Sequence, residues 1–79
     1  MTNLEKYNLI FAEVFSVDES QLNADFDNQH VDGWDSVRQL SLTTAMEDAF
    51  DIMLDAEDII DFNSYERGKV ILAKYEIEF

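Results

Sequence analysis

An Asp-Ser pair, Asp35 and Ser36, follows Gly33 and Trp34 and opens a stretch with helix-like spacing. Asp35 stands in the capping position, where its side chain can accept a hydrogen bond from the first turn. Ser36 is then the first helical residue, free to point its hydroxyl at solvent. The backbone N–H groups of a first turn lack partners, and the helix end carries about half a positive charge. A phosphate ester on the Ser36 hydroxyl would be stabilised there, so we predict that Ser36 is an attachment point.

Three other roles are conceivable for the residues around this pair. Ser36 could be a second capping serine that carries no modification. His30 could act as its general base, but a lone loop histidine is more often a surface residue, and no third group is spaced to orient it, so we expect no catalytic residue. Asp25, Asp27 and Asp32 could offer oxygen atoms to calcium. An EF-hand loop counted from Asp25 lacks the required glycine and the final glutamate, so we expect no dedicated metal site.

Composition and charge limit the classes of function. The 79 residues are 47% hydrophobic, which predicts one small domain over residues 1–79 with a compact core. No cysteine is present, which excludes disulfides, a thiol nucleophile and zinc–thiolate sites. A net charge of −13 predicts repulsion from nucleic acids and anionic membranes and attraction to basic protein surfaces. We expect a cytoplasmic protein, because we find no signal-like segment and no run of about 18 apolar residues. We also expect a monomer.

Apolar residues at intervals of three and four predict a first helix over residues 3–15, capped by Thr2 or Asn3. Its apolar face consists of Leu4, Tyr7, Ile10, Phe11, Val14 and Phe15. Turn-forming residues then predict a long loop over residues 16–35, with one helical turn near residues 19–22. Leu22, Phe26 and Val31 are spaced to pin this loop onto the core, and Trp34 is expected to pack over the start of the second helix.

The second half of the chain predicts three more helices. One covers residues 36–50, and its broad apolar side predicts a central, well-buried helix. That side consists of Leu40, Leu42, Met46, Ala49 and Phe50. A short helix is expected over residues 56–61, around Ile59 and Ile60, and a last one over residues 65–75, capped by Asn63 or Ser64. The tail, residues 75–79, alternates like a strand without a partner and should be frayed or docked. The expected fold class is an all-α bundle with three main helices, one short helix and a long first loop.

The stretch GWDSVRQLSLTTAMEDAFDI resembles the acyl carrier protein family, whose hallmark is Asp-Ser-Leu at the head of the second helix. The resemblance covers nearly the whole chain and implies an acyl-carrier-like bundle. It implies that a phosphopantetheinyl transferase moves 4′-phosphopantetheine from coenzyme A onto Ser36, with Asp35 helping to engage the transferase and its metal. The thiol of that arm would carry an acyl or aminoacyl group as a thioester to loading and downstream biosynthetic enzymes. The chain itself would be no enzyme, and the missing cysteine fits a thiol that arrives with the cofactor.

The sequence also departs from the family pattern. The motif leucine is replaced by Val37, and Arg38 and Ser41 stand where fatty-acid carriers usually place acidic residues that contact their partners. With Glu47 and Asp48, these residues form the expected partner-docking surface. The departure implies a specialised or secondary pathway, such as polyketide or peptide synthesis. The alternative function is an unmodified acidic module that binds a basic protein by charge.

Overall fold

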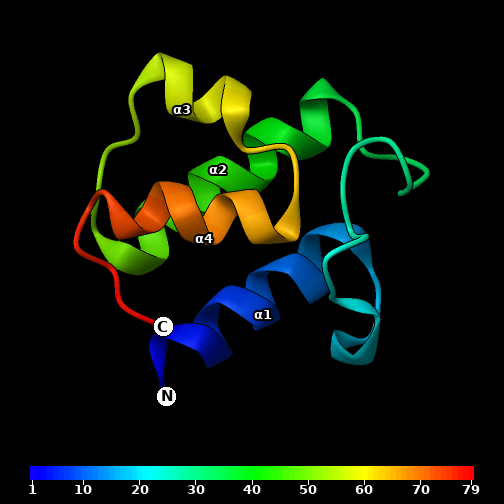
Figure 1. Cartoon of the computed structure of the whole chain (residues 1–79), viewed down its shortest axis with the longest axis horizontal. Helices are drawn as coiled ribbons and strands as arrows, with labels where there is room; N and C mark the ends of the chain where they lie inside the picture. Colours follow the sequence, from blue (N-terminus) through cyan, green and yellow to red (C-terminus); the bar gives the residue numbers. More distant parts are fainter.

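The computed structural model describes residues 1–79, and four α-helices and one 3-10 turn account for its regular structure. In chain order these are α1 (Asn3–Phe15), η1 (Glu19–Gln21), α2 (Ser36–Phe50), α3 (Ala56–Asp61) and α4 (Tyr65–Ala73). The prediction of an all-α bundle with three main helices, one short helix and a long first loop is confirmed (Figure 1). None of the helices combines the length and the apolar character that spanning a membrane requires.

Local sequence signals set the helix ends. Thr2 caps α1 in a reciprocal capping box with Glu5, in which each side chain accepts the other residue's backbone N–H. The α4 helix begins at the alternative cap Ser64, whose hydroxyl accepts the N–H of Arg67 at 2.8 Å. The expected end at residue 75 is wrong, because the N–H groups of Lys74 and Tyr75 bond three residues back and tighten the chain into a turn.

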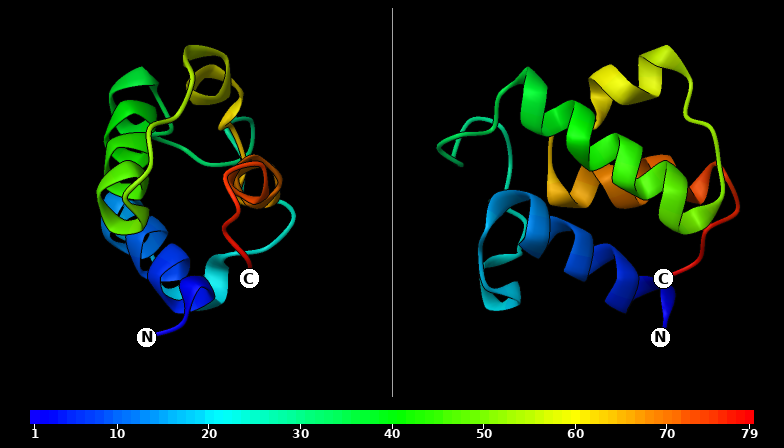
Figure 2. Two further views of the ribbon diagram at one scale, coloured as in Figure 1. Left: turned by 90° about the vertical axis from the view of Figure 1, so that its left-hand side faces the viewer. Right: turned by 180° about the vertical axis from the view of Figure 1, so that it is seen from behind.

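The core is aromatic, and the long first loop contributes to it. The Phe11 ring of α1 lies near the rings of two loop residues, at 5.9 Å from Phe26 and 6.1 Å from Trp34. Leu22 and Val31 pack against the same core, so the loop is pinned as predicted. The loop also pairs with the α3–α4 connection, since Phe26 accepts the N–H of Tyr65 at 2.8 Å. In Figures 1 and 2 this loop closes one end of the bundle.

The α2 helix is not the central, well-buried helix that its sequence predicts. It runs along the outside of the bundle (Figure 2) and buries only a narrow stripe of Leu42, Thr43 and Met46. Leu40 is 59% exposed and Ala49 is also exposed. Thr43 fits the stripe because its hydroxyl donates back to the carbonyls of its own helix. The opposite side of α2, which carries Val37 and Ser41, is therefore left open.

The short helix α3 forms where expected but turns an unexpected face inward. Ile59 packs on the core, whereas Ile60 is 72% exposed and Asp58 is the buried residue, at 6% exposure. The neighbouring apolar residues Leu54 and Phe62, which flank the helix, are buried. The segment is thus anchored by its two ends, and α3 itself contributes little apolar burial.

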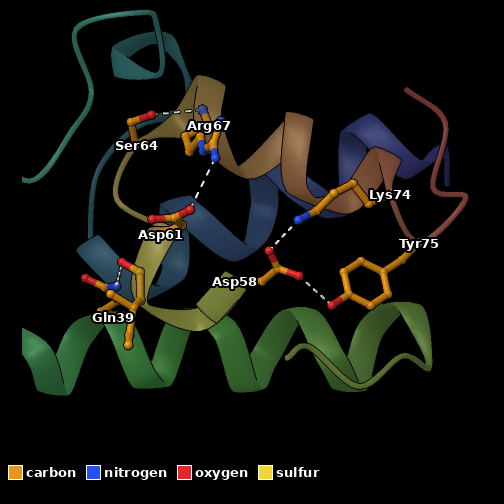
Figure 3. Close-up of polar contacts among 8 residues, drawn as sticks. Gln39, Asp58, Asp61, Ser64, Arg67, Lys74 and Tyr75 are labelled. Atoms are coloured by element: carbon orange, nitrogen blue, oxygen red, sulfur yellow. Dashed lines mark hydrogen bonds and ion pairs between the residues drawn. The ribbon is translucent and has the colours of Figure 1, made fainter. Parts of the chain in front are cut away.

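Polar contacts from α4 and the residues after it hold α3 in place (Figure 3). Asp58 accepts hydrogen bonds from the Lys74 ammonium at 2.5 Å and the Tyr75 hydroxyl at 2.6 Å. The same Tyr75 oxygen accepts the N–H of Asp55 at 3.0 Å, and Asp55 has no side-chain cap of its own. The hydroxyl of a distant residue therefore takes over part of the capping of α3.

The C-terminal tail is docked and forms no strand. Asn3 donates its side-chain amide to the carbonyl of Glu78 at 3.0 Å. The Phe79 ring lies 5.0 Å from that of Tyr7, edge to face, and 6.5 Å from that of Phe50. These contacts bring the two chain termini close together (Figures 1 and 2). The tail thereby covers the end of the core between α1 and α2.

The side chains around Gly68 leave no room for a methyl group, and Gly68→Ala tests this. An added methyl group at Gly68 would lie 2.6 Å from the Phe62 ring and collide with the Tyr7 hydroxyl, which donates to the Tyr65 carbonyl at 2.5 Å. We expect the free energy of unfolding to fall by about 1–3 kcal/mol, despite the better helix propensity of alanine. Urea titration followed by the fluorescence of the single tryptophan measures it. In a Tyr7→Phe background, Gly68→Ala should lower the free energy of unfolding by less, because the Tyr7 hydroxyl is absent. An equal decrease in both backgrounds would show that the alanine methyl group does not collide with that hydroxyl.

The buried Asp58 carboxylate predicts a pH-dependent stability. The hydrogen bonds from Lys74 and then Tyr75 lower the pKa of Asp58 below its ordinary value of 3.8. Its stabilising contribution is therefore complete above that ordinary value and is lost as the pH falls through the lowered one. We expect Asp58→Asn to lower the free energy of unfolding by about 1–3 kcal/mol at pH 7. The difference from wild type should shrink as the pH falls through the lowered pKa of Asp58.

Urea titrations of both proteins at several pH values test this expectation. Asp55→Asn is the matched control, because it neutralises a carboxylate of the same segment that caps nothing. A difference between Asp58→Asn and wild type that stays constant down to acid pH would mean that the charge of Asp58 does not hold α3.

Candidate functional site

Ser36 lies at the exposed start of α2, and its neighbour Asp35 makes the cap. Asp35 Oδ1 accepts the N–H of Arg38 at 2.8 Å, and the Asp35 carbonyl accepts the N–H of Gln39 at 2.9 Å. Ser36 Oγ takes part in no hydrogen bond within the chain and is exposed to solvent. The division of labour expected from the sequence, with Asp35 capping and Ser36 free, is what the structure has.

The residues before the pair hold it in a fixed place. Gly33 has a φ of +85°, a conformation that glycine adopts without strain, and its carbonyl accepts the N–H of Asp35 at 3.0 Å. Trp34 is 8% exposed, and its ring lies 4.7 Å from that of Phe15. The indole N–H has no hydrogen-bond partner, so apolar and aromatic contacts alone anchor the ring. Ser36 thus follows a rigidly packed residue by two positions.

A groove lies beside Ser36, between α2 and α3. It has a volume of about 380 Å³ and is lined by Ser36, Gln39 and Leu40 of α2 and by Ile59 and Ile60 of α3. Gln39 spans it at one point, since Nε2 donates to the carbonyls of Ile59 at 2.7 Å and Ile60 at 2.9 Å. A wider depression of about 920 Å³ involves only Ala73 and the tail and contains no predicted site residue.

Gln39 was not among the residues predicted for the site, although the sequence carries a signal for it. It follows Ser36 by three positions, and residues three apart in a helix are neighbours on one face. What the sequence does not reveal is the partner of that face. The carbonyls that Gln39 reaches belong to a helix twenty positions further along the chain.

Three of the five predicted docking residues face solvent on the open side of α2. Val37 is 73% exposed, and Ser41 and Asp48 are exposed as well. Ser41 and Asp48 contribute to a shallow depression of about 450 Å³ together with Leu40, Thr44 and Ala45. These side chains make no bond within the chain that a partner would have to break.

The other two predicted docking residues are engaged within the chain. Arg38 Nη1 donates to the carbonyl of Val14 at 2.8 Å, near the C-terminal end of α1. A cation at this end of a helix is stabilised by the free carbonyls there. Glu47 is half-buried, and its carboxylate accepts the N–H of Leu54 at 2.9 Å in the α2–α3 connection. Both side chains therefore help to join helices, and their contact with partners stays a prediction.

His30 is paired with an aspartate of its own loop. Its Nδ1 lies 2.8 Å from Asp27 Oδ1, which also accepts the N–H groups of Gln29 and His30. The side-chain hydrogen bond from His30 is the largest of the contacts that lower the pKa of Asp27. Asp27 thus organises the turn, and the imidazole is held there. No group of three or more acidic or histidine side chains is arranged to hold a metal ion.

All five basic side chains contact other parts of the chain. The three that pair with oxygen atoms are Arg38 with Val14, Arg67 with Asp61 and Lys74 with Asp58. The two that lie over aromatic rings are Lys6, 5.8 Å from the Phe50 ring centre, and Lys69, 4.4 Å from that of Tyr65. The charged side chains that remain available to partner proteins are therefore almost all carboxylates.

Comparisons with known proteins do not assign the chain to a family. No protein-family model matches the chain, and no curated protein or solved structure is significantly similar to it. The resemblance to acyl carrier proteins therefore rests on the residues around Ser36 and on the helices that present them. The function that this resemblance implies is a proposal.

Proposed function

We propose that this chain is a carrier protein whose Ser36 receives a 4′-phosphopantetheine arm from coenzyme A. The observation that carries the proposal is the exposed, unbonded Ser36 hydroxyl directly after the capping Asp35. In the transfer, Ser36 Oγ loses its proton and forms an ester bond to the phosphorus of the arm. The nucleotide part of coenzyme A leaves in the same step, under catalysis by a phosphopantetheinyl transferase.

The first turn of α2 suits the product of this transfer. The backbone N–H groups of Ser36 and Val37 precede the first intrahelical bonds, so they are free to face a phosphodiester. The positive end of the helix stabilises the negative charge of that group. Asp35 uses Oδ1 for the cap, which leaves Oδ2 available to the transferase and its metal. These features support attachment at Ser36 in preference to other serines of the chain.

The arm would supply the chemistry that the chain lacks. Since the sequence has no cysteine, the thiol of the arm is the one thiol available to bind an acyl or aminoacyl group as a thioester. The chain catalyses nothing and presents its cargo, in the cytoplasm, to loading and downstream enzymes with basic surfaces. The neutral and apolar residues Val37 and Ser41 beside the site favour partners of a specialised pathway over those of general fatty-acid synthesis.

A second candidate function is an unmodified module that binds a basic protein. The exposed side chains of Val37, Leu40 and Ile60 favour it, because they surround Ser36 and offer apolar contact amid acidic residues. The mass of the protein isolated from its own cells separates the two functions. Only the carrier would bear the pantetheine adduct.

Attachment at Ser36 predicts the outcome of an in vitro transfer. Incubation with coenzyme A and a promiscuous phosphopantetheinyl transferase should add the mass of one arm to the wild type. Ser36→Ala should add none, because the accepting oxygen is gone. Ser41→Ala is the matched control, since it removes another exposed hydroxyl from the same helix and should be labelled in full. Labelling of Ser36→Ala would refute the proposal.

The open side of α2 predicts partner choice. Generic fatty-acid enzymes should load the holo wild type poorly, and Ser41→Glu should raise kcat/KM by up to about fivefold, the value of one exposed ion pair. A dedicated partner should respond in the opposite direction. Arg38→Gln, without an added acid, is the suitable companion variant, because Arg38→Glu would put a carboxylate beside the Val14 carbonyl.

Ala73→Glu controls for net charge, because it adds the same charge at an exposed position of α4. Loading kinetics are compared at equal holo content. Equal effects of Ser41→Glu and Ala73→Glu would mean that total charge, and not the face beside Ser36, selects the enzymes.

A further inference from the structure

We propose that Gln39 is a positioning residue of the Ser36 site, which locks α3 against α2 and keeps a long apolar cargo from entering between the two helices. The proposal rests on attachment of the arm at Ser36. It goes further by assigning a role to a residue outside the Asp-Ser motif and by stating which cargo stays exposed. Its basis is the bridge from Gln39 to the last turn of α3, one helical turn from Ser36.

Within α3, Ile59 packs on the core, and side chains of other elements hold the helix by hydrogen bonds. Leu54 before it and Phe62 after it are buried and act as fixed ends. Between them, Asp58 is held by Lys74 and Tyr75, on the side toward α4 (Figure 3). On the side toward α2, Gln39 is the one side chain that hydrogen-bonds α3. Gln39 is thus the one polar side chain that ties the last turn of α3 to the helix that begins at Ser36.

Gln39 is suited to this role because it satisfies two acceptors at once. The carbonyls of Ile59 and Ile60 lie in the last turn of α3, where carbonyls have no partner within the helix. The two hydrogens of Gln39 Nε2 serve one carbonyl each, at 2.7 and 2.9 Å. Without them, both carbonyls would seek water, and the last turn would move away from α2 toward solvent.

The residues that line the groove indicate which cargo could bind there if the last turn of α3 moved away from α2. Leu40, Ile59 and Ile60 line it with apolar atoms, and Leu40 and Ile60 are mostly exposed. Each methylene that leaves water for an apolar surface gains about a factor of four in equilibrium. A widened groove would therefore hold a long acyl chain and leave a short one outside. With Gln39 in place, cargo of either length stays in solvent and is equally available to enzymes.

Hydrogen exchange on the unmodified chain tests the lock. Gln39→Met keeps the size of the side chain and removes both donors. The amides of residues 58–62 should exchange about five- to twenty-five-fold faster than in the wild type, since each of the two lost hydrogen bonds contributes about a factor of five. Amides of α1 should be unaffected. Gln29→Met is the control, because the Gln29 side chain is exposed and bonds nothing. Unchanged exchange at residues 58–62 would overturn the proposal, whatever Ser36 accepts.

The cargo is tested on holo protein that carries an acetyl or a decanoyl thioester. Hydroxylamine cleaves either thioester to a hydroxamate and the free arm thiol, at a rate that reports how exposed it is. In the wild type both cargoes should react equally fast. In Gln39→Met the decanoyl thioester should react severalfold more slowly and the acetyl thioester at the wild-type rate, a length dependence that simple loss of stability would not produce. Protection of decanoyl cargo in the wild type, or equal rates in the variant, would overturn the assignment of Gln39 while attachment at Ser36 stands.

Discussion

The Phe11 ring is the contact on which the arrangement of the chain depends. It lies between 4.9 and 6.2 Å from the rings of Tyr7, Phe15, Phe26, Trp34, Phe62 and Tyr65. These rings come from α1, from the first loop, from the C-terminal end of α3 and from the start of α4. Because Trp34 belongs to this cluster, the residue that precedes the Asp-Ser pair is fixed to the core. A long loop, which would otherwise leave the start of α2 mobile, instead delivers Ser36 to a defined point.

Much of the fold follows from the sequence because its signals are local. The spacing of the apolar residues and the cap at Thr2 define α1, and Asp35 and Ser64 mark the starts of α2 and α4 through contacts with their own first turns. The same locality makes the free hydroxyl of Ser36 predictable. It follows from the neighbouring cap and needs no knowledge of the tertiary structure.

Most of the features that the sequence did not predict depend on residues distant in the chain. The burial of Asp58 makes sense only once Lys74 and Tyr75 reach it, because a carboxylate avoids the interior unless it is paired. Leu40 suggested a wider buried face on α2, yet no element covers that side. Arg38 reads as a surface cation and instead reaches the end of α1. Hydrophobic periodicity indicates which face of a single helix is apolar. The surroundings of these three residues depend instead on contacts between helices.

Every basic side chain has a partner within its own chain, which affects how copies of this molecule meet. Two copies therefore have few free positive groups to offer each other, and each carries a net charge of −13. Their repulsion extends over about 8 Å at physiological ionic strength. Even a crowded solution should therefore contain separate molecules, each surrounded by small cations. The serine of each copy then faces open solvent, where another copy of the chain does not compete for the approach.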